Sequence, residues 1–203
     1  MVEPGHFQRY ERESIVRLGL ARCVVAVMLV AGVTACEADS DPNDPRIVAP
    51  PDLDAGVALK NTTPQRPYVF RDLTICLDRS GEVTVESVES KDTFGDLTLD
   101  AFALVPAQQA FQMDQTKSIS EQGKEAGRGV LAFVCSTNLA TSQVTAASPP
   151  IALVLQYSRP TDTSAGNHGV TVHYTSGGHK YSKFLKYTAI LCAPGDKTTE
   201  HCS

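Results

Sequence analysis

Histidine side chains gather in the C-terminal part of the sequence, where they could ligate a metal ion. Four fall within 34 residues: His168, His173, His179 and His201. Gly177-Gly178 lies between two alternating segments and is typical of a β-hairpin turn. In such a hairpin Ser176 pairs with His179, and His173 pairs with Ser182. Because side chains alternate between faces, His173 and His179 then point away from each other. We expect solvated histidines, no metal site and no cofactor.

The cysteines are the second group of reactive side chains. Cys23 lies in an N-terminal apolar run, Cys36 ends it, and four more follow: Cys76, Cys135, Cys192 and Cys202. An even number in an exported domain predicts two disulfides. Zinc is the alternative, but no two of the four have Cys-x₂-Cys spacing. Closing a short loop costs little entropy, which favours Cys192 with Cys202 and leaves Cys76 with Cys135. Pairing of Cys76 with Cys192 stays open.

Motifs for nucleophilic catalysis are missing from the sequence. There is no G-x-S-x-G elbow, and Ser176-Gly177-Gly178 fits a hairpin turn. The segment GKEAGRG, residues 123–129, lacks the order of a phosphate-binding loop. Paired carboxylates for glycoside cleavage stay open, because sequence spacing does not fix their distance across a sheet. We expect no catalytic residues and no enzyme, with an envelope-associated hydrolase as the alternative.

The N-terminus has the features of an export signal. The apolar run spans residues 23–33, too short for the roughly 20 residues of a membrane-spanning helix. Arg17 and Arg22 precede it, as in a positive n-region. The segment before them is long and contains acidic residues, so we expect the true start near Val16. Residues 1–35 are therefore predicted to be a signal peptide.

The run ends in Val33-Thr34-Ala35-Cys36, which resembles the lipobox of bacterial lipoproteins. The resemblance implies that Cys36 carries diacylglycerol and becomes the first residue of the mature chain. Two acyl chains anchor a protein stably to a membrane. The implied location is the extracytoplasmic face of the cell membrane. An ordinary secretory signal and a retained signal anchor are the alternatives.

A second, looser resemblance covers residues 70–195. The segments CLDRSGEVTVESV, FVC and ILCAP are similar in spacing to uncharacterised exported lipoproteins of actinobacteria. This resemblance implies a β-sandwich and no known activity.

Composition divides the chain after Cys36 into two parts. Five prolines and many Asp residues fall between Pro42 and Pro64, a composition that buries little apolar area. We predict a disordered, lipid-anchored tether over residues 36–66 and a folded domain over residues 67–203. The chain has a net charge of −5 and no basic patch, which argues against nucleic-acid binding. The expected partners are the membrane and an envelope protein or ligand of unknown identity.

The folded part alternates with period two, which predicts about seven strands. They are expected at residues 72–78, 82–90, 96–105, 130–136, 151–158, 169–176 and 180–192, with a bulge near Glu86-Ser87. Residues 107–115 are the best candidate for a helix, and a short one. The predicted fold is all-β, an antiparallel β-sandwich of immunoglobulin-like arrangement.

Two loops are left for function or for mobile surface, at residues 108–128 and 160–169. If the protein binds a ligand, aromatic and Met side chains are the first to consider, with core packing as their alternative fate. These side chains are Phe111, Met113, Tyr157 and Tyr174. The predicted function is non-catalytic binding at the cell envelope.

Overall fold

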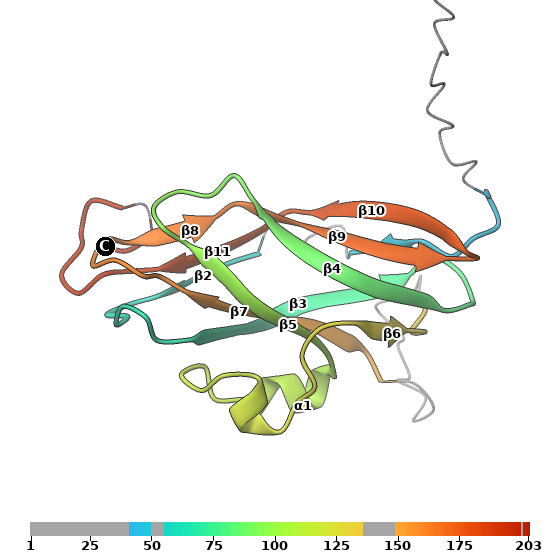
Figure 1. Cartoon of the computed structure of the whole chain (residues 1–203), viewed down its shortest axis with the longest axis horizontal. Coiled ribbons are helices and arrows are strands. Elements are labelled where there is room, and N and C mark those ends of the chain that lie inside the picture. The colour runs from blue at the N-terminus through green and yellow to red at the C-terminus, as the bar shows by residue number, and fades with distance from the viewer. Residues whose placement is uncertain (1–40, 50–54, 136–148, 200) are drawn as a thin grey trace, which may run out of the picture. The chain divides into compact units, whose positions relative to one another are not determined.

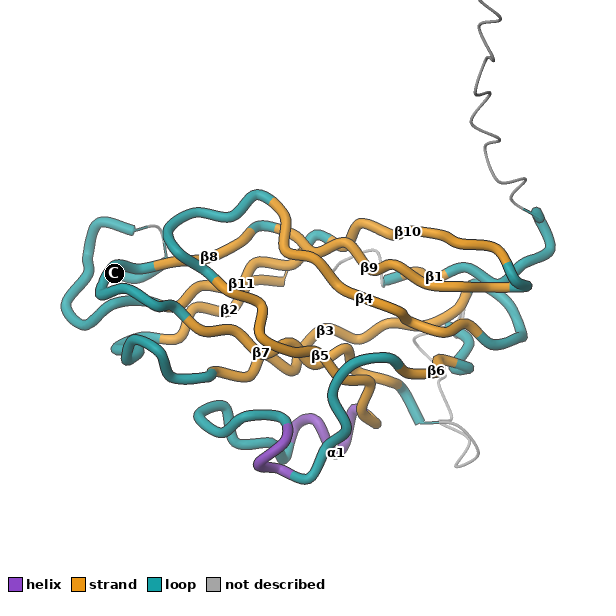
Figure 2. Tube along the Cα trace, viewed as in Figure 1, coloured by secondary structure: helices purple, strands orange, loops and turns teal. Residues whose placement is uncertain are grey.

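The computed structural model describes residues 41–49, 55–135, 149–199 and 201–203. The predicted signal peptide and Cys36 lie outside the described residues. Strands dominate the described chain, and one short helix accompanies them (Figure 2). The strands are β1 (Ile47–Val48), β2 (Ala55–Leu59), β3 (Tyr68–Leu77), β4 (Val83–Lys91), β5 (Thr98–Pro106), β6 (Gly129–Leu131), β7 (Ile151–Ser158), β8 (Ala165–Asn167), β9 (Gly169–Ser176), β10 (His179–Leu185) and β11 (Tyr187–Leu191). The helical elements are α1 (Ala107–Phe111) and a 3₁₀ turn, η1 (Ser120–Gln122).

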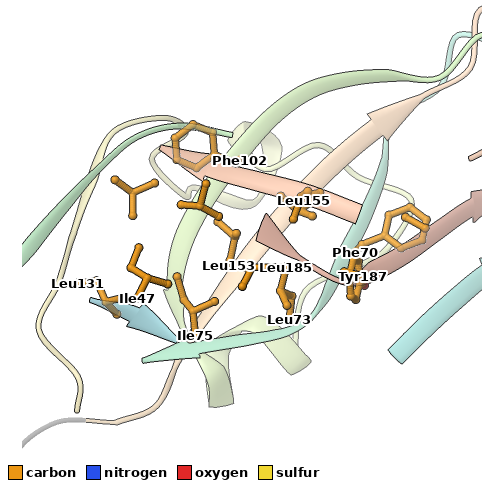
Figure 3. Close-up of a cluster of buried hydrophobic side chains, with 14 of the residues drawn as sticks. Ile47, Phe70, Leu73, Ile75, Phe102, Leu131, Leu153, Leu155, Leu185 and Tyr187 are labelled. Carbon is orange, nitrogen blue, oxygen red and sulfur yellow. The ribbon is translucent and has the colours of Figure 1, made fainter. Parts of the chain in front are cut away.

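Three sheets share one apolar core. Their strand orders are β1-β3-β7-β5, β10-β9-β4-β6 and β2-β11-β8. Strand pairs are antiparallel except β2 with β11, which run parallel. Inward side chains from all three sheets meet, among them Phe70, Leu153, Leu185 and Tyr187 (Figure 3). The all-β sandwich is confirmed, with one parallel pair where only antiparallel pairs were expected.

The local predictions for the strands are confirmed. Each predicted strand has a counterpart, but the one predicted at 130–136 is a strand only over Gly129–Leu131 (β6). The last predicted strand divides at Lys186 into β10 and β11, which belong to different sheets. The β9–β10 hairpin pairs Ser176 with His179, as expected from its two-glycine turn. The register of β4 against β9 shifts between Val85 and Ser87, so Glu86 is the extra residue of the predicted bulge. The predicted short helix is α1.

The prediction of a disordered tether over residues 36–66 is wrong for the residues described there. Strand β1 pairs with β3, and Ile47 is only 1% exposed. Strand β2 pairs with β11, and the buried Thr62 hydroxyl donates a hydrogen bond to the Cys192 carbonyl. The sandwich therefore begins before residue 67. The partners of these segments lie far along the chain, so proline-rich composition did not predict their pairing.

The long loops also belong to the folded structure. The segment between β5 and β6 covers the outer side of the β3-β7-β5 sheet, where Ala110, Met113 and Ile119 are buried (Figure 1). The backbone N–H of Ile119 donates to the Gln156 side chain at 2.8 Å. In the second loop, β8 adds an antiparallel strand to β11. Neither loop is only mobile surface. The first buries apolar side chains against a sheet, and the second forms backbone hydrogen bonds with β11.

Both disulfides form within the sandwich. Cys76 bonds to Cys135 across 59 positions of sequence, and Cys192 bonds to Cys202 across 10. This is the pairing that the short C-terminal loop favoured. No zinc site is formed by these cysteines, since their sulfur atoms bond to one another.

Candidate binding surface

The solvent-facing side of the β10-β9-β4-β6 sheet is the surface we call the outer face. Its core-facing side chains, such as Val85, Val172 and Leu185, alternate with residues that point outward. The outward residues come into cross-strand rows through the register of the sheet. They are Thr84, Glu86, Ser87, Glu89, Val130, Thr171, His173, Thr175, Lys180, Ser182 and Phe184.

A shallow depression of about 400 Å³ lies at the β4 bulge. It is lined by Glu86, Ser87, His173, Tyr174, Lys180 and Tyr181. The bulge turns Glu86 out of the ladder, where its carboxylate accepts from Thr175 Oγ1 at 2.6 Å and lies 2.9 Å from the Arg128 guanidinium. These contacts hold the carboxylate in place at the rim of the depression.

A second charged group lies beside it on the outer face. Glu89 lies 2.8 Å from Lys91 Nζ and 3.4 Å from Nε2 of His173. Its hydrogen bond from Lys91, with a smaller contribution from His173, lowers the pKa of the Glu89 carboxyl. The outer face therefore carries both signs of charge, which suits recognition of a polar partner better than of a uniformly charged one.

Exposed apolar side chains flank this polar centre. Val130 on β6 is 59% exposed and Phe184 on β10 is 50% exposed. The Phe184 ring lies over Gly169 of β9, where a Cβ atom would overlap the ring. Among the described residues, the other large hydrophobic side chain with such exposure is Phe111, at 61%, on the helical cover of another sheet.

At the end of the β9–β10 hairpin, a carboxylate fastens the N-terminal segment to the sheet. We call this the Asp44 clamp: Asp44, Arg46, His179 and Tyr181. Asp44 is 8% exposed, and its Oδ2 accepts from the Tyr181 hydroxyl at 2.6 Å and lies 2.9 Å from Nδ1 of His179. The guanidinium of Arg46 lies 3.5 Å above the centre of the Tyr181 ring. The hydrogen bond from Tyr181, followed by that from His179, lowers the pKa of the Asp44 carboxyl.

The pair of Asp44 and His179 supplies two of the three groups of an acyl-transfer triad. Ser176, a residue type that can act as a nucleophile, is the cross-strand partner of His179. Its Oγ is buried and has no hydrogen-bond partner, so His179 does not activate it. What the contacts of Asp44 do show is that the N-terminal segment is tied to the β9–β10 hairpin.

The histidines are separated as the hairpin predicted. His179 contacts Asp44, while His173 faces Glu89 on the outer face. His168 stacks on Phe94, with ring centres 5.7 Å apart. Within the described ranges, no three His, Cys, Asp or Glu side chains come together as metal ligands would.

A second polar fastening lies at the opposite end of the sandwich. We call it the Arg159 clamp: Arg159, Thr62 and the Cys192 carbonyl. The Arg159 side chain is fully buried, and its Nε donates to Thr62 Oγ1 at 2.8 Å. Its terminal nitrogens donate to the carbonyls of Thr62, Thr161 and Thr163. Thr62 in turn donates from Oγ1 to the Cys192 carbonyl at 2.8 Å.

Of the four side chains predicted as possible contacts, three are in the core. Met113, Tyr157 and Tyr174 are at most 4% exposed, and burial raises the pKa of Tyr157 to about 12. Phe111 alone of the four is exposed. Sequence reasoning did not single out the outer face, although strand alternation already placed its side chains on one side. The sequence alone did not tell which side of this sheet is covered by other elements and which side faces solvent.

No protein-family model matches the sequence, and a search of the curated proteins finds no match. Among the described residues, no helix has the length and apolar character needed to cross a bilayer.

Proposed function

We propose that this chain is a lipid-anchored extracytoplasmic protein whose sandwich binds a partner at the cell envelope without catalysing a reaction. Its contact surface is the outer face. The observation that carries this assignment is that Val130 and Phe184 are exposed on either side of the polar depression at Glu86 and His173. Exposed apolar groups around fixed polar groups are typical of recognition surfaces.

The proposed address has two supports. The lipobox-like VTAC sequence at Cys36 follows a short apolar run. The two disulfides fit an oxidising compartment outside the cytoplasm. A hydrolase is disfavoured because the buried Ser176 hydroxyl makes no hydrogen bond to the Asp44–His179 pair.

The address is tested by comparing the wild type with Cys36→Ser in a bacterium that processes lipoproteins. We expect the wild type to gain a diacylglyceryl mass, to begin at Cys36 and to stay with membranes, and the variant to lose all three properties. Intact mass and membrane partition measure this. Release of both forms, or retention of residues 1–35 in both, would contradict the proposal.

Binding through the outer face is tested by photo-crosslinking on intact cells. A photoreactive amino acid at Thr175 or Ser182 of the outer face is compared with one at Phe111, which is exposed on another surface. We expect one discrete adduct from the outer-face positions, lost when Thr175→Arg places a bulky cation beside Glu86 in a chain labelled at Ser182. Equal adducts from Phe111, or none from either outer-face position, would reject this surface.

A further inference from the structure

The first described residues of the chain are fastened to one end of the sandwich. The backbone carbonyl of Asp41 accepts from the Arg46 guanidinium at 3.0 Å, and the Pro42 carbonyl accepts from Arg79 at 2.7 Å. Asp44 follows in its clamp. The bonds of Pro42 and Asp44 reach the β3–β4 turn and the β9–β10 hairpin, and the Asp41 bond adds a local link to Arg46, so the chain is held from Asp41 onward.

The end to which it is fastened consists of two hairpin turns. We call it the turn end: residues 41–46, 78–82 and 177–180. Arg46 N–H donates to Asp78 Oδ1 at 2.8 Å, which ties the N-terminal segment to the β3–β4 turn. Figure 1 shows the blue start of the described chain beside the β9–β10 turn, and the C-terminus at the other end of the strands.

This fastening leaves a short link to the anchor. Four residues lie between Cys36 and Asp41, and the five Cα–Cα steps that join the two span at most about 18 Å. A free tether reaching residue 66 would span about 90 Å in a polyproline-like conformation. The difference decides which part of the domain can reach the bilayer. The nine residues of β4 alone extend the domain by about 30 Å away from the turn end.

We propose that the turn end is the membrane-facing end of the domain and lies against the lipid headgroups. This rests on the proposed lipid anchor at Cys36. The loop of residues 193–199 at the other end then points away from the membrane, and the outer face runs between the two ends, open to a partner.

The short link, rather than charge, sets this orientation. The turn end carries the exposed cations Arg79 and Lys180, but also the exposed carboxylate of Glu82. The Asp78 carboxylate is paired with Arg79 at 3.0 Å. The orientation should therefore be the same on neutral and anionic lipids, whereas a headgroup-binding patch would prefer anionic ones.

The test measures energy transfer from the lipidated full chain to acceptor-labelled lipid in vesicles of neutral phospholipid. A fluorescent amino acid is placed at Glu82, at the turn end, or at Lys197, at the other end; both positions are exposed. We expect severalfold stronger transfer from Glu82. Insertion of ten Gly/Ser residues after Ser40 should narrow the difference in transfer between Glu82 and Lys197, since a flexible link of about 15 residues can extend to about 50 Å and lets the domain turn over.

A matched glycine pair tests the fastening itself. A Cβ atom at Gly177 would overlap the Asp44 carboxylate, whereas one at Gly178 meets nothing within 4 Å, and both residues have positive φ. Gly177→Ala should free residues 41–45 and weaken transfer from Glu82, while Gly178→Ala should not. A chain without the diacylglyceryl mass would overturn both proposals. A lipidated chain with equal or reversed transfer from the two positions would overturn this one alone.

Discussion

The two ends of the sandwich fasten the same N-terminal segment by different chemistry. At the turn end, the Asp44 clamp relies on a carboxylate, which becomes protonated in acid. At the other end, the Arg159 clamp relies on a fully buried guanidinium. Each end also has a disulfide, closing a long loop at the turn end and a short one at the other. One end is thus held by a long covalent loop and a titratable contact, and the other by a short loop and a permanent cation.

The difference shows how a polar, proline-rich segment can belong to a folded domain. Among its described residues, Ile47 is buried in the core and Ala49, Val57 and Leu59 pack partly buried against it, and polar contacts add to this burial. Single polar residues at its two ends, Asp44 and Thr62, make bonds to partners more than 90 positions away. Removing one fastening should loosen one end and leave the other, which the following changes test.

The largest effect is expected from removing the long disulfide. With 59 positions between its cysteines, Cys76–Cys135 restricts the unfolded chain more than Cys192–Cys202 does, with 10. Chain entropy predicts losses of about 4 kcal/mol for Cys76→Ala/Cys135→Ala and about 3 kcal/mol for Cys192→Ala/Cys202→Ala. Denaturant unfolding of the two double variants beside the wild type measures the free energies. A larger loss from the short loop would contradict the entropic ranking.

Removing the buried cation should come next in size. Arg159→Met keeps much of the side-chain volume but leaves the carbonyls of Thr62, Thr161 and Thr163 without their donor. We expect a loss of about 3 kcal/mol, because buried acceptors without partners cost about 1–3 kcal/mol each and water can reach some of them. Denaturant unfolding measures it.

The control for this change is Arg128→Met, which removes an arginine that is 67% exposed and lies outside both clamps. Exposed ion pairs contribute about 0–1 kcal/mol, so this variant should stay close to the wild type. Equal losses from the two variants would mean that Arg159 matters only as bulk or charge.

The sequence predicted what neighbouring residues determine. Alternation located β3, β4, β7 and β9, and the glycine pair fixed the β9–β10 register, because each signal lies within one strand or turn. The same register correctly separated His173 from His179. These features need no knowledge of distant partners.

Features that depend on distant pairing were missed. Strand β1 has two residues, and β2 pairs in parallel with β11, about 130 positions away, so neither has a local signature. The outer face was missed for a related reason: which side of a sheet stays open depends on where α1 and the other sheets pack. Arg159 appears in the sequence as an ordinary surface residue, and only the loops around it bury it.

Acid should weaken the turn end through Asp44. Its pKa is lowered in the folded state from 3.8, so the carboxylate stabilises the fold above that pH, and this contribution is lost as the pH falls through the folded pKa. Asp44→Asn lacks it at every pH. The difference in Tm between wild type and variant should therefore be greatest near neutral pH and shrink well below pH 3.8.

Asp196 is a second carboxyl group whose protonation weakens the fold in acid, so its effect must be separated from that of Asp44. Hydrogen bonds from Ser164 and then Thr199 hold the pKa of its carboxyl far below the ordinary value, so acid also weakens the C-terminal loop. Wild-type acid unfolding sums Asp44, Asp196 and the other carboxyl groups with a lowered pKa, such as Glu89, so only the difference between wild type and Asp44→Asn isolates the Asp44 contribution. A Tm difference that stays constant with pH would show that Asp44 acts by shape alone.

The smallest effect is the difference between alanine at Gly177 and at Gly178. Both residues have left-handed φ, +55° and +86°, so each substitution carries a similar backbone cost of about 1–2 kcal/mol. Only at Gly177 does the new methyl group also displace the Asp44 carboxylate. Gly177→Ala should therefore have the lower Tm. In an Asp44→Ala background, where no carboxylate remains to be displaced, the two substitutions should cost the same, and a gap that persists there would place its cause in the turn instead of the clamp.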